Sequence, residues 1–122
     1  MRRSPAPIAF CIATAALLAA CASPPPVVVD AVPPPFVDAL VARLQAEPVA
    51  NPPASVWRYH YAGRTVFYVP PKCCDFPSEL YEADGDVICQ PDGGLTGRGD
   101  GRCPEFHATR RDGVRVWIDP RG

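Results

Sequence analysis

Four cysteines in the second half of the chain constrain this sequence more than any other feature. Cys73 and Cys74 are adjacent, and Cys89 and Cys103 follow further along the chain. An even number of cysteines in a small exported domain predicts two disulfides. A zinc site with four cysteine ligands is the rival interpretation, but zinc ligands usually come in pairs two to four residues apart, so adjacent cysteines fit zinc poorly.

The pairing of the four cysteines is only partly predicted. A bond between Cys73 and Cys74 would close a strained ring around a single peptide bond, so each is expected to pair with Cys89 or Cys103. Neighbouring side chains of an extended chain point to opposite sides, which suits two different partners. Which thiol meets which partner stays open. Each such bridge typically contributes about 2–4 kcal/mol.

The first 20 residues have the order of a secretory signal peptide. Arg2 and Arg3 precede an apolar stretch over residues 8–18, which is shorter than the roughly 20 apolar residues that a membrane-spanning helix needs. The LAAC sequence at 18–21 resembles the lipobox of bacterial lipoproteins, which implies that Cys21 is the lipidated first residue of the mature chain. Ordinary cleavage that leaves Cys21 as a free thiol is the alternative.

Lipidation would place the protein on a membrane, and Ala22 after the cysteine suggests, by analogy, the outer membrane facing the periplasm. Removing Arg2 and Arg3 from the 12 Lys and Arg leaves 10 against 13 Asp and Glu, a net charge of −3. This balance argues against nucleic acid as a partner. The expected partners are the membrane, through the lipid anchor, and a protein of the envelope. No cofactor is expected.

Residues 21–35 carry the lipidated cysteine and a proline-rich tether, SPPPVVVDAVPPP at 23–35, with polyproline II character. Apolar residues over 36–46 then fall on one side of a helical wheel, which predicts an amphipathic helix that ends before Pro48. From residue 56 the apolar period changes to two, which indicates β-strands.

Three turns predict β-hairpins, at residues 62–64, at Asp84-Gly85 and at Asp112-Gly113. In the first hairpin, Trp57, Tyr59 and Tyr61 should share one face with Val66 and Tyr68. The predicted fold class is therefore α+β: a small single domain over 36–119, with one N-terminal amphipathic helix on an antiparallel β-sheet of hairpins and two disulfides. That helix is expected to cover part of an aromatic face formed by Trp57, Tyr59, Tyr61, Phe67, Tyr68 and Trp117.

Several segments resemble a family of small bacterial lipoproteins that carry a cysteine-containing domain of unknown function. They are YVPPKCCD at 68–75, Leu80-Tyr81, Ile88-Cys89 and GGLTGRGDGRCPEF at 93–106. The resemblance covers roughly residues 56–106. It implies a family membership but no established activity.

Residues 91–104, here called the glycine-rich loop, are the main candidate for function. The candidate binding residues in this loop are Asp92, Thr96, Arg98 and Asp100. Trp57 of the aromatic face is a further candidate. The carboxylates of Asp84, Asp86, Asp92 and Asp100 are weak candidates for calcium ligands. The alternative is that these aspartates hydrogen-bond the amides of their own turns.

Catalysis is not expected. The side chains that could act in catalysis are those of His60, His107, Ser55 and Ser78. The sequence contains no nucleophile elbow and no metal-binding pair of histidines to go with them. The histidines are expected on strand faces. We therefore expect a membrane-anchored envelope lipoprotein with a non-enzymatic binding or structural role. The alternative is an inhibitor of a secreted hydrolase or protease, presented on a disulfide-locked loop.

Overall fold

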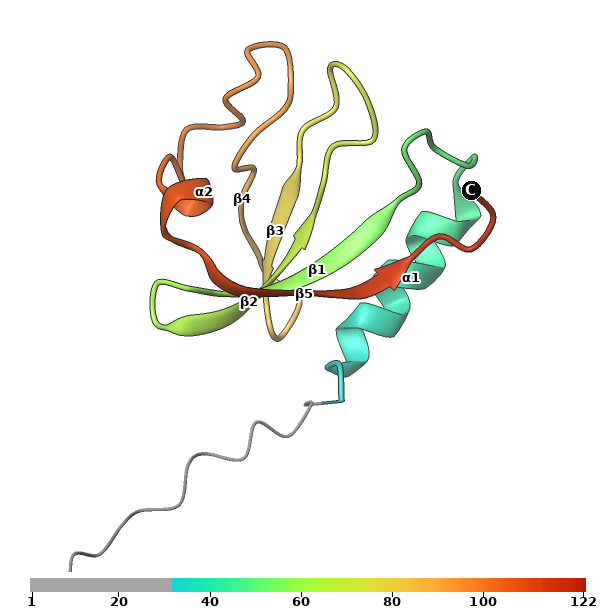
Figure 1. Cartoon of the computed structure of the whole chain (residues 1–122), viewed down its shortest axis with the longest axis horizontal. Coiled ribbons are helices and arrows are strands. Elements are labelled where there is room, and N and C mark those ends of the chain that lie inside the picture. The colour runs from blue at the N-terminus through green and yellow to red at the C-terminus, as the bar shows by residue number, and fades with distance from the viewer. Residues whose placement is uncertain (1–31) are drawn as a thin grey trace, which may run out of the picture. The chain divides into compact units, whose positions relative to one another are not determined.

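A five-stranded antiparallel sheet organises residues 32–122, the part of the chain that the computed structural model describes (Figure 1). The predicted signal peptide, Cys21 and most of the tether lie outside the described residues. The strand order is β4-β3-β2-β1-β5, so β5 returns to pair with β1 at the edge opposite β4. The elements are α1 (Pro35–Ala46), β1 (Ser55–Tyr61), β2 (Arg64–Val69), β3 (Glu79–Glu82), β4 (Val87–Cys89), α2 (Phe106–Thr109) and β5 (Arg111–Ile118).

Two of the three predicted hairpins are confirmed. β1 and β2 pair around Ala62 and Gly63, which both have positive φ, at 49° and 78°. β3 and β4 pair around the Asp84-Gly85 turn, where the Gly85 N–H donates to the Glu82 carbonyl at 3.0 Å. At Ala62 and Gly63, positive φ at the centre of a two-residue turn matches the twist of the flanking strands. The β3–β4 turn differs: Ala83 and Asp84 lie at its centre, and Gly85 takes positive φ (98°) directly after them.

The third predicted hairpin is wrong, because Asp112 and Gly113 lie inside β5. The register passes from Arg58↔Val114 to His60↔Arg111, so β5 carries one extra residue there, a β-bulge with Asp112 at φ 55°. A side chain at Gly113 would overlap the Tyr59 ring, so the glycine permits the close approach of the two strands.

Helix α1 covers one face of the sheet. Pro35 occupies its first turn, where a missing N–H costs nothing, and Asp38 lies near the positive end of the helix dipole. The buried side chains of α1 are Val37, Leu40 and Leu44, and they pack against Val56, Phe67, Val69 and Tyr81 of the sheet. No helix among residues 32–122 is long and apolar enough to cross a membrane.

The prediction that α1 covers part of the aromatic face is confirmed for Phe67, with Trp117 packed against the same cluster. The other predicted members lie on the opposite face of the sheet: Trp57, Tyr59, Tyr61 and Tyr68. Because side chains alternate along a strand, Phe67 and Val69 point to α1 while Val66 and Tyr68 point away. Phe106 of α2 covers this second face and is fully buried there. Trp57, Tyr59 and Tyr61 of β1 pack against the same cluster.

Two disulfides form, as predicted, but with a different pairing. Cys89, at the end of β4, is bonded to Cys103, and their Cα atoms are 6.1 Å apart. Cys73 and Cys74 are bonded to each other, which contradicts the expectation that each would reach Cys89 or Cys103. The reason is tertiary: Cys89 and Cys103 meet in the core beneath Phe106, whereas the chain turns at Cys73 and Cys74 on the surface.

Candidate functional site

The glycine-rich loop is held in a fixed shape by its own backbone. The Cys89–Cys103 disulfide closes its two ends. Its five glycines all have positive φ: Gly93, Gly94, Gly97, Gly99 and Gly101. Gly99 lies so close to the stem of the loop that a Cβ atom there would overlap the Gln90 carbonyl oxygen. Glycine is therefore required at this position for two reasons, its φ and its close approach.

Asp100 stabilises the shape of the loop through hydrogen bonds to backbone N–H groups of the loop and its stem. Its carboxylate accepts hydrogen bonds from the Gln90 N–H at 3.1 Å and from the Arg102 N–H at 2.9 Å, and it pairs with the Arg102 guanidinium at 2.8 Å. Desolvation raises the pKa of Asp100, but these hydrogen bonds outweigh it and hold the pKa below its ordinary value. Asp100 therefore serves the loop's own structure.

Asp92 points inward and ties the loop to the sheet and to α2. Its carboxylate accepts a hydrogen bond from the Tyr68 hydroxyl at 2.7 Å and contacts His107 Nε2. Burial, followed by the hydrogen bond to Asp92, raises the pKa of Tyr68 well above its ordinary value. The buried Ser78 hydroxyl donates to the Asp92 carbonyl and accepts from the Asp92 N–H. Both hydrogen-bonding functions of Ser78 thus hold the loop in place.

The remaining loop candidates lie at the tip and face solvent. The Thr96 hydroxyl accepts a hydrogen bond from the Arg98 N–H at 3.2 Å, which shapes the turn. Leu95, which the sequence did not single out, is 90% exposed beside them. The structure therefore brings Thr96 and Arg98 together with an outward-facing apolar side chain.

The other predicted site residues lie elsewhere. Trp57 donates to the Ser55 hydroxyl at 3.1 Å, stacks on Tyr59 and lies beneath Arg115. His60 is exposed on β1, whereas His107 lies on α2 and not on a strand.

The four aspartates considered for calcium do not form one group. Asp84 accepts the Asp86 N–H at 3.0 Å within the β3–β4 turn, whereas Asp92 and Asp100 have the separate partners described above. Among the residues that the structure describes, no group of three or more His, Cys, Asp or Glu side chains is placed to hold a metal ion.

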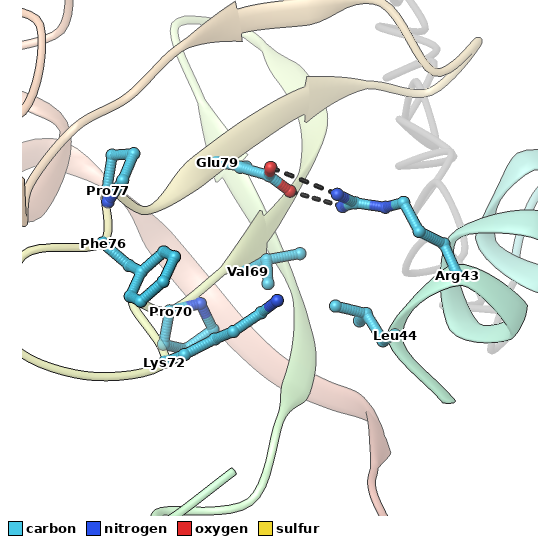
Figure 2. A pocket seen from close by; sticks show the side chains of 8 residues that line it. All are labelled: Arg43, Leu44, Val69, Pro70, Lys72, Phe76, Pro77 and Glu79. Atoms are coloured by element: carbon cyan, nitrogen blue, oxygen red, sulfur yellow. Dashed lines mark hydrogen bonds and ion pairs between the residues drawn. The ribbon is translucent and has the colours of Figure 1, made fainter. Parts of the chain in front are cut away.

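A cleft of about 190 Å³ lies between α1 and the segment that joins β2 to β3, and Figure 2 shows its lining. Arg43 of α1 reaches both carboxylate oxygens of Glu79, at 3.3 and 2.5 Å, and donates to the Tyr81 hydroxyl at 3.0 Å. Lys72 is paired with Glu47. The charges at the rim are therefore neutralised within the chain. Phe76, 58% exposed, leaves an apolar side chain beside the cleft.

The ion pair at this cleft predicts an acid-dependent part of the stability. Burial raises the pKa of Glu79, but hydrogen bonds from Arg43 and Tyr81 outweigh it and lower the pKa below its ordinary value of 4.5. Its contribution is present above pH 4.5 and is lost as the pH falls through the lower folded-state pKa. Because the pair is partly exposed, Glu79→Gln should cost about 0.5–1 kcal/mol at neutral pH and nothing in strong acid.

Urea unfolding at a series of pH values measures this effect. The matched control is Glu105→Gln, which changes an exposed carboxylate. Equal losses for Glu79→Gln at neutral pH and in strong acid would show that the ion pair is not the cause.

A match to a model of a protein family places the chain in that family. No curated protein and no solved structure matches it significantly. The model of DUF6970, a domain of unknown function, matches residues 42–119. This range contains all five strands, both disulfides and the glycine-rich loop. With most of its length matched, the chain belongs to the DUF6970 domain family.

Proposed function

We propose that this protein is a membrane-anchored, non-enzymatic binding module that holds a protein partner through the tip of its glycine-rich loop. The observation that carries the proposal is Leu95, which is 90% exposed on a loop that is closed by a disulfide. A single exposed leucine is ordinary on a protein surface. Here it stands at the tip of a segment that the rest of the domain holds in place.

The fixed shape of the loop lowers the entropy that is lost when a partner binds. A free loop with five glycines would lose much conformational entropy when a partner orders it. Hydrogen bonds that the carboxylates of Asp100 and Asp92 accept, together with the Cys89–Cys103 bridge, have already restricted this loop in the folded protein. An apolar anchor on such a loop can fill a pocket on a partner, and Thr96 and Arg98 add polar contacts at its rim.

Anchoring on the membrane is the second part of the proposal. It rests on the lipobox-like LAAC sequence at 18–21 and on the proline-rich tether after it. Two or three acyl chains on Cys21 would hold the domain stably on a bilayer, by analogy on the outer membrane facing the periplasm. The loop tip would then meet partners at the membrane surface.

Inhibition of a secreted hydrolase or protease is the second candidate, and the same loop favours it. A rigid loop with an outward-facing leucine suits an apolar specificity pocket in an enzyme cleft. The two candidates differ in the expected partner: inhibition requires that it is an enzyme whose turnover falls when the domain binds. An activity assay of the captured partner separates them.

Leu95→Asp should weaken binding to the partner at least about tenfold, because a carboxylate would have to be desolvated in an apolar pocket. A photo-crosslinking amino acid at position 96, in the membrane-anchored protein, identifies the partner. Binding of that purified partner to the wild-type and variant domains then gives the dissociation constants.

The matched control is Val87→Asp, which places the same charge on an apolar residue of β4 that is 54% exposed. It should leave the dissociation constant unchanged. Equal weakening by both variants, or none by Leu95→Asp, would refute binding through the loop tip.

A further inference from the structure

The two disulfides differ sharply in their access to solvent. Cys89 and Cys103 are buried, with 0% and 5% of their surface exposed, inside the cluster beneath Phe106. Cys73 and Cys74 are both exposed at the turn between β2 and β3. Thiol–disulfide exchange needs a thiolate to reach a sulfur atom directly, so access separates the two bonds chemically.

We propose that Cys73–Cys74 is a thiol–disulfide exchange site for dithiol reductants of the cell envelope, while Cys89–Cys103 stays oxidised. One thiolate of the reductant attacks Sγ of one cysteine, the Cys73–Cys74 bond breaks, and the other cysteine leaves as a thiolate that takes a proton from water. The second thiol of the reductant, as a thiolate, then attacks the reductant's own sulfur in the mixed disulfide, the bond to the protein breaks, and the second cysteine leaves as a thiolate that also takes a proton from water. The reductant leaves as a disulfide, and both cysteines of the protein are left as thiols.

The backbone of this turn favours a change of shape when the bond opens. Cys74 has φ 43°, in the left-handed region that residues with a side chain rarely adopt. The bond between neighbouring cysteines closes a small ring that restrains this conformation. Once the ring opens, Cys74 is free to take an ordinary negative φ.

Hydrogen bonds connect the turn to the glycine-rich loop. The Phe76 N–H donates to the Cys73 carbonyl at 2.9 Å, and the Phe76 carbonyl accepts from the Gly94 N–H at 3.1 Å. Gly94 directly precedes Leu95 at the loop tip. A rearrangement at Cys73 and Cys74 therefore loosens the support of the loop on this side, while the Cys89–Cys103 bridge keeps its ends closed.

The test is stepwise reduction of the folded, oxidised protein with dithiothreitol, without denaturant. Alkylation at each step and peptide mapping locate the free thiols. We expect Cys73 and Cys74 to be alkylated together, at least about tenfold faster than Cys89 and Cys103. Glutathione disulfide should then reform the first bond. The matched control, Cys73→Ser with Cys74→Ser, should remain folded and give no early alkylation.

Hydrogen exchange provides a second readout that requires no partner and is independent of the proposed function. Exchange at the Gly94 amide should become faster on selective reduction of the wild type and stay unchanged in the double variant under the same treatment. Simultaneous opening of both bonds, or earlier opening of Cys89–Cys103, would overturn the exchange site. An unchanged Gly94 amide after selective reduction would overturn its connection to the loop.

Discussion

Phe106→Ala is expected to lower the free energy of unfolding by about 3–5 kcal/mol, a large fraction of the roughly 5–15 kcal/mol typical of native proteins. Phe106 is fully buried, and its ring lies 5.8, 5.3 and 5.2 Å from the rings of Tyr59, Tyr61 and Tyr68. Truncation removes these contacts and leaves a cavity between α2 and the sheet. The rigid aromatic rings around it can close that cavity only in part.

Urea unfolding followed by tryptophan fluorescence measures this loss, since Trp57 packs against the same cluster. Phe76→Ala is the matched control, because it deletes the same side chain where 58% of it is exposed. The control should change stability by no more than about 0.5 kcal/mol. Phe106→Leu, which keeps most of the volume, should lose clearly less than Phe106→Ala. Similar losses for Phe106→Ala and Phe76→Ala would contradict the assignment of Phe106 to the core.

Cys21→Ser should move the protein from the membrane fraction to the soluble fraction almost completely. Each buried methylene of an acyl chain contributes about 0.8 kcal/mol, so two chains hold a protein that otherwise has little affinity for the bilayer. The net charge of −3 expected for the mature chain gives no attraction to anionic lipid that would replace the anchor.

Fractionation of cells that express the variant tests this, together with the mass of the N-terminal peptide. Cys11→Ser is the control, because Cys11 lies in the segment that cleavage should remove. That variant should stay on the membrane with its lipid. Membrane retention of Cys21→Ser, or an unmodified Cys21 in the wild type, would rule out the anchor.

Local physical chemistry explains the elements that were predicted well. The apolar period over 36–46, bounded by prolines, corresponds to α1 at Pro35–Ala46. The alternation from residue 56 and the turns at Gly63 and Gly85 correspond to the hairpins β1–β2 and β3–β4. In each case the residues that determine the conformation lie within a few positions of one another, so the sequence carries the information locally.

Asp112-Gly113 shows where a local signal is ambiguous. Positive φ suits both the centre of a hairpin turn and a β-bulge, and the same residue types favour both. Pairing of β5 with β1, more than 50 positions earlier in the chain, selects the bulge. The pattern was correct about the positive φ of Asp112, but Gly113 does not take positive φ and the element is a bulge.

By itself, the sequence determined the fold class, the helix, two hairpins, the presence of two disulfides and the glycine-rich loop as the main candidate. Only the tertiary structure decided the disulfide pairing, the face that α1 covers, the contacts of Asp92 with Tyr68 and His107, and the cleft where Arg43 meets Glu79. Those features join residues far apart in the sequence, such as Cys89 and Cys103, which are 14 positions apart. The bond between the neighbours Cys73 and Cys74 is the exception, and it forms because the core brings Cys89 and Cys103 together. Contacts of that range depend on how the two faces of the sheet are covered, which no local pattern specifies.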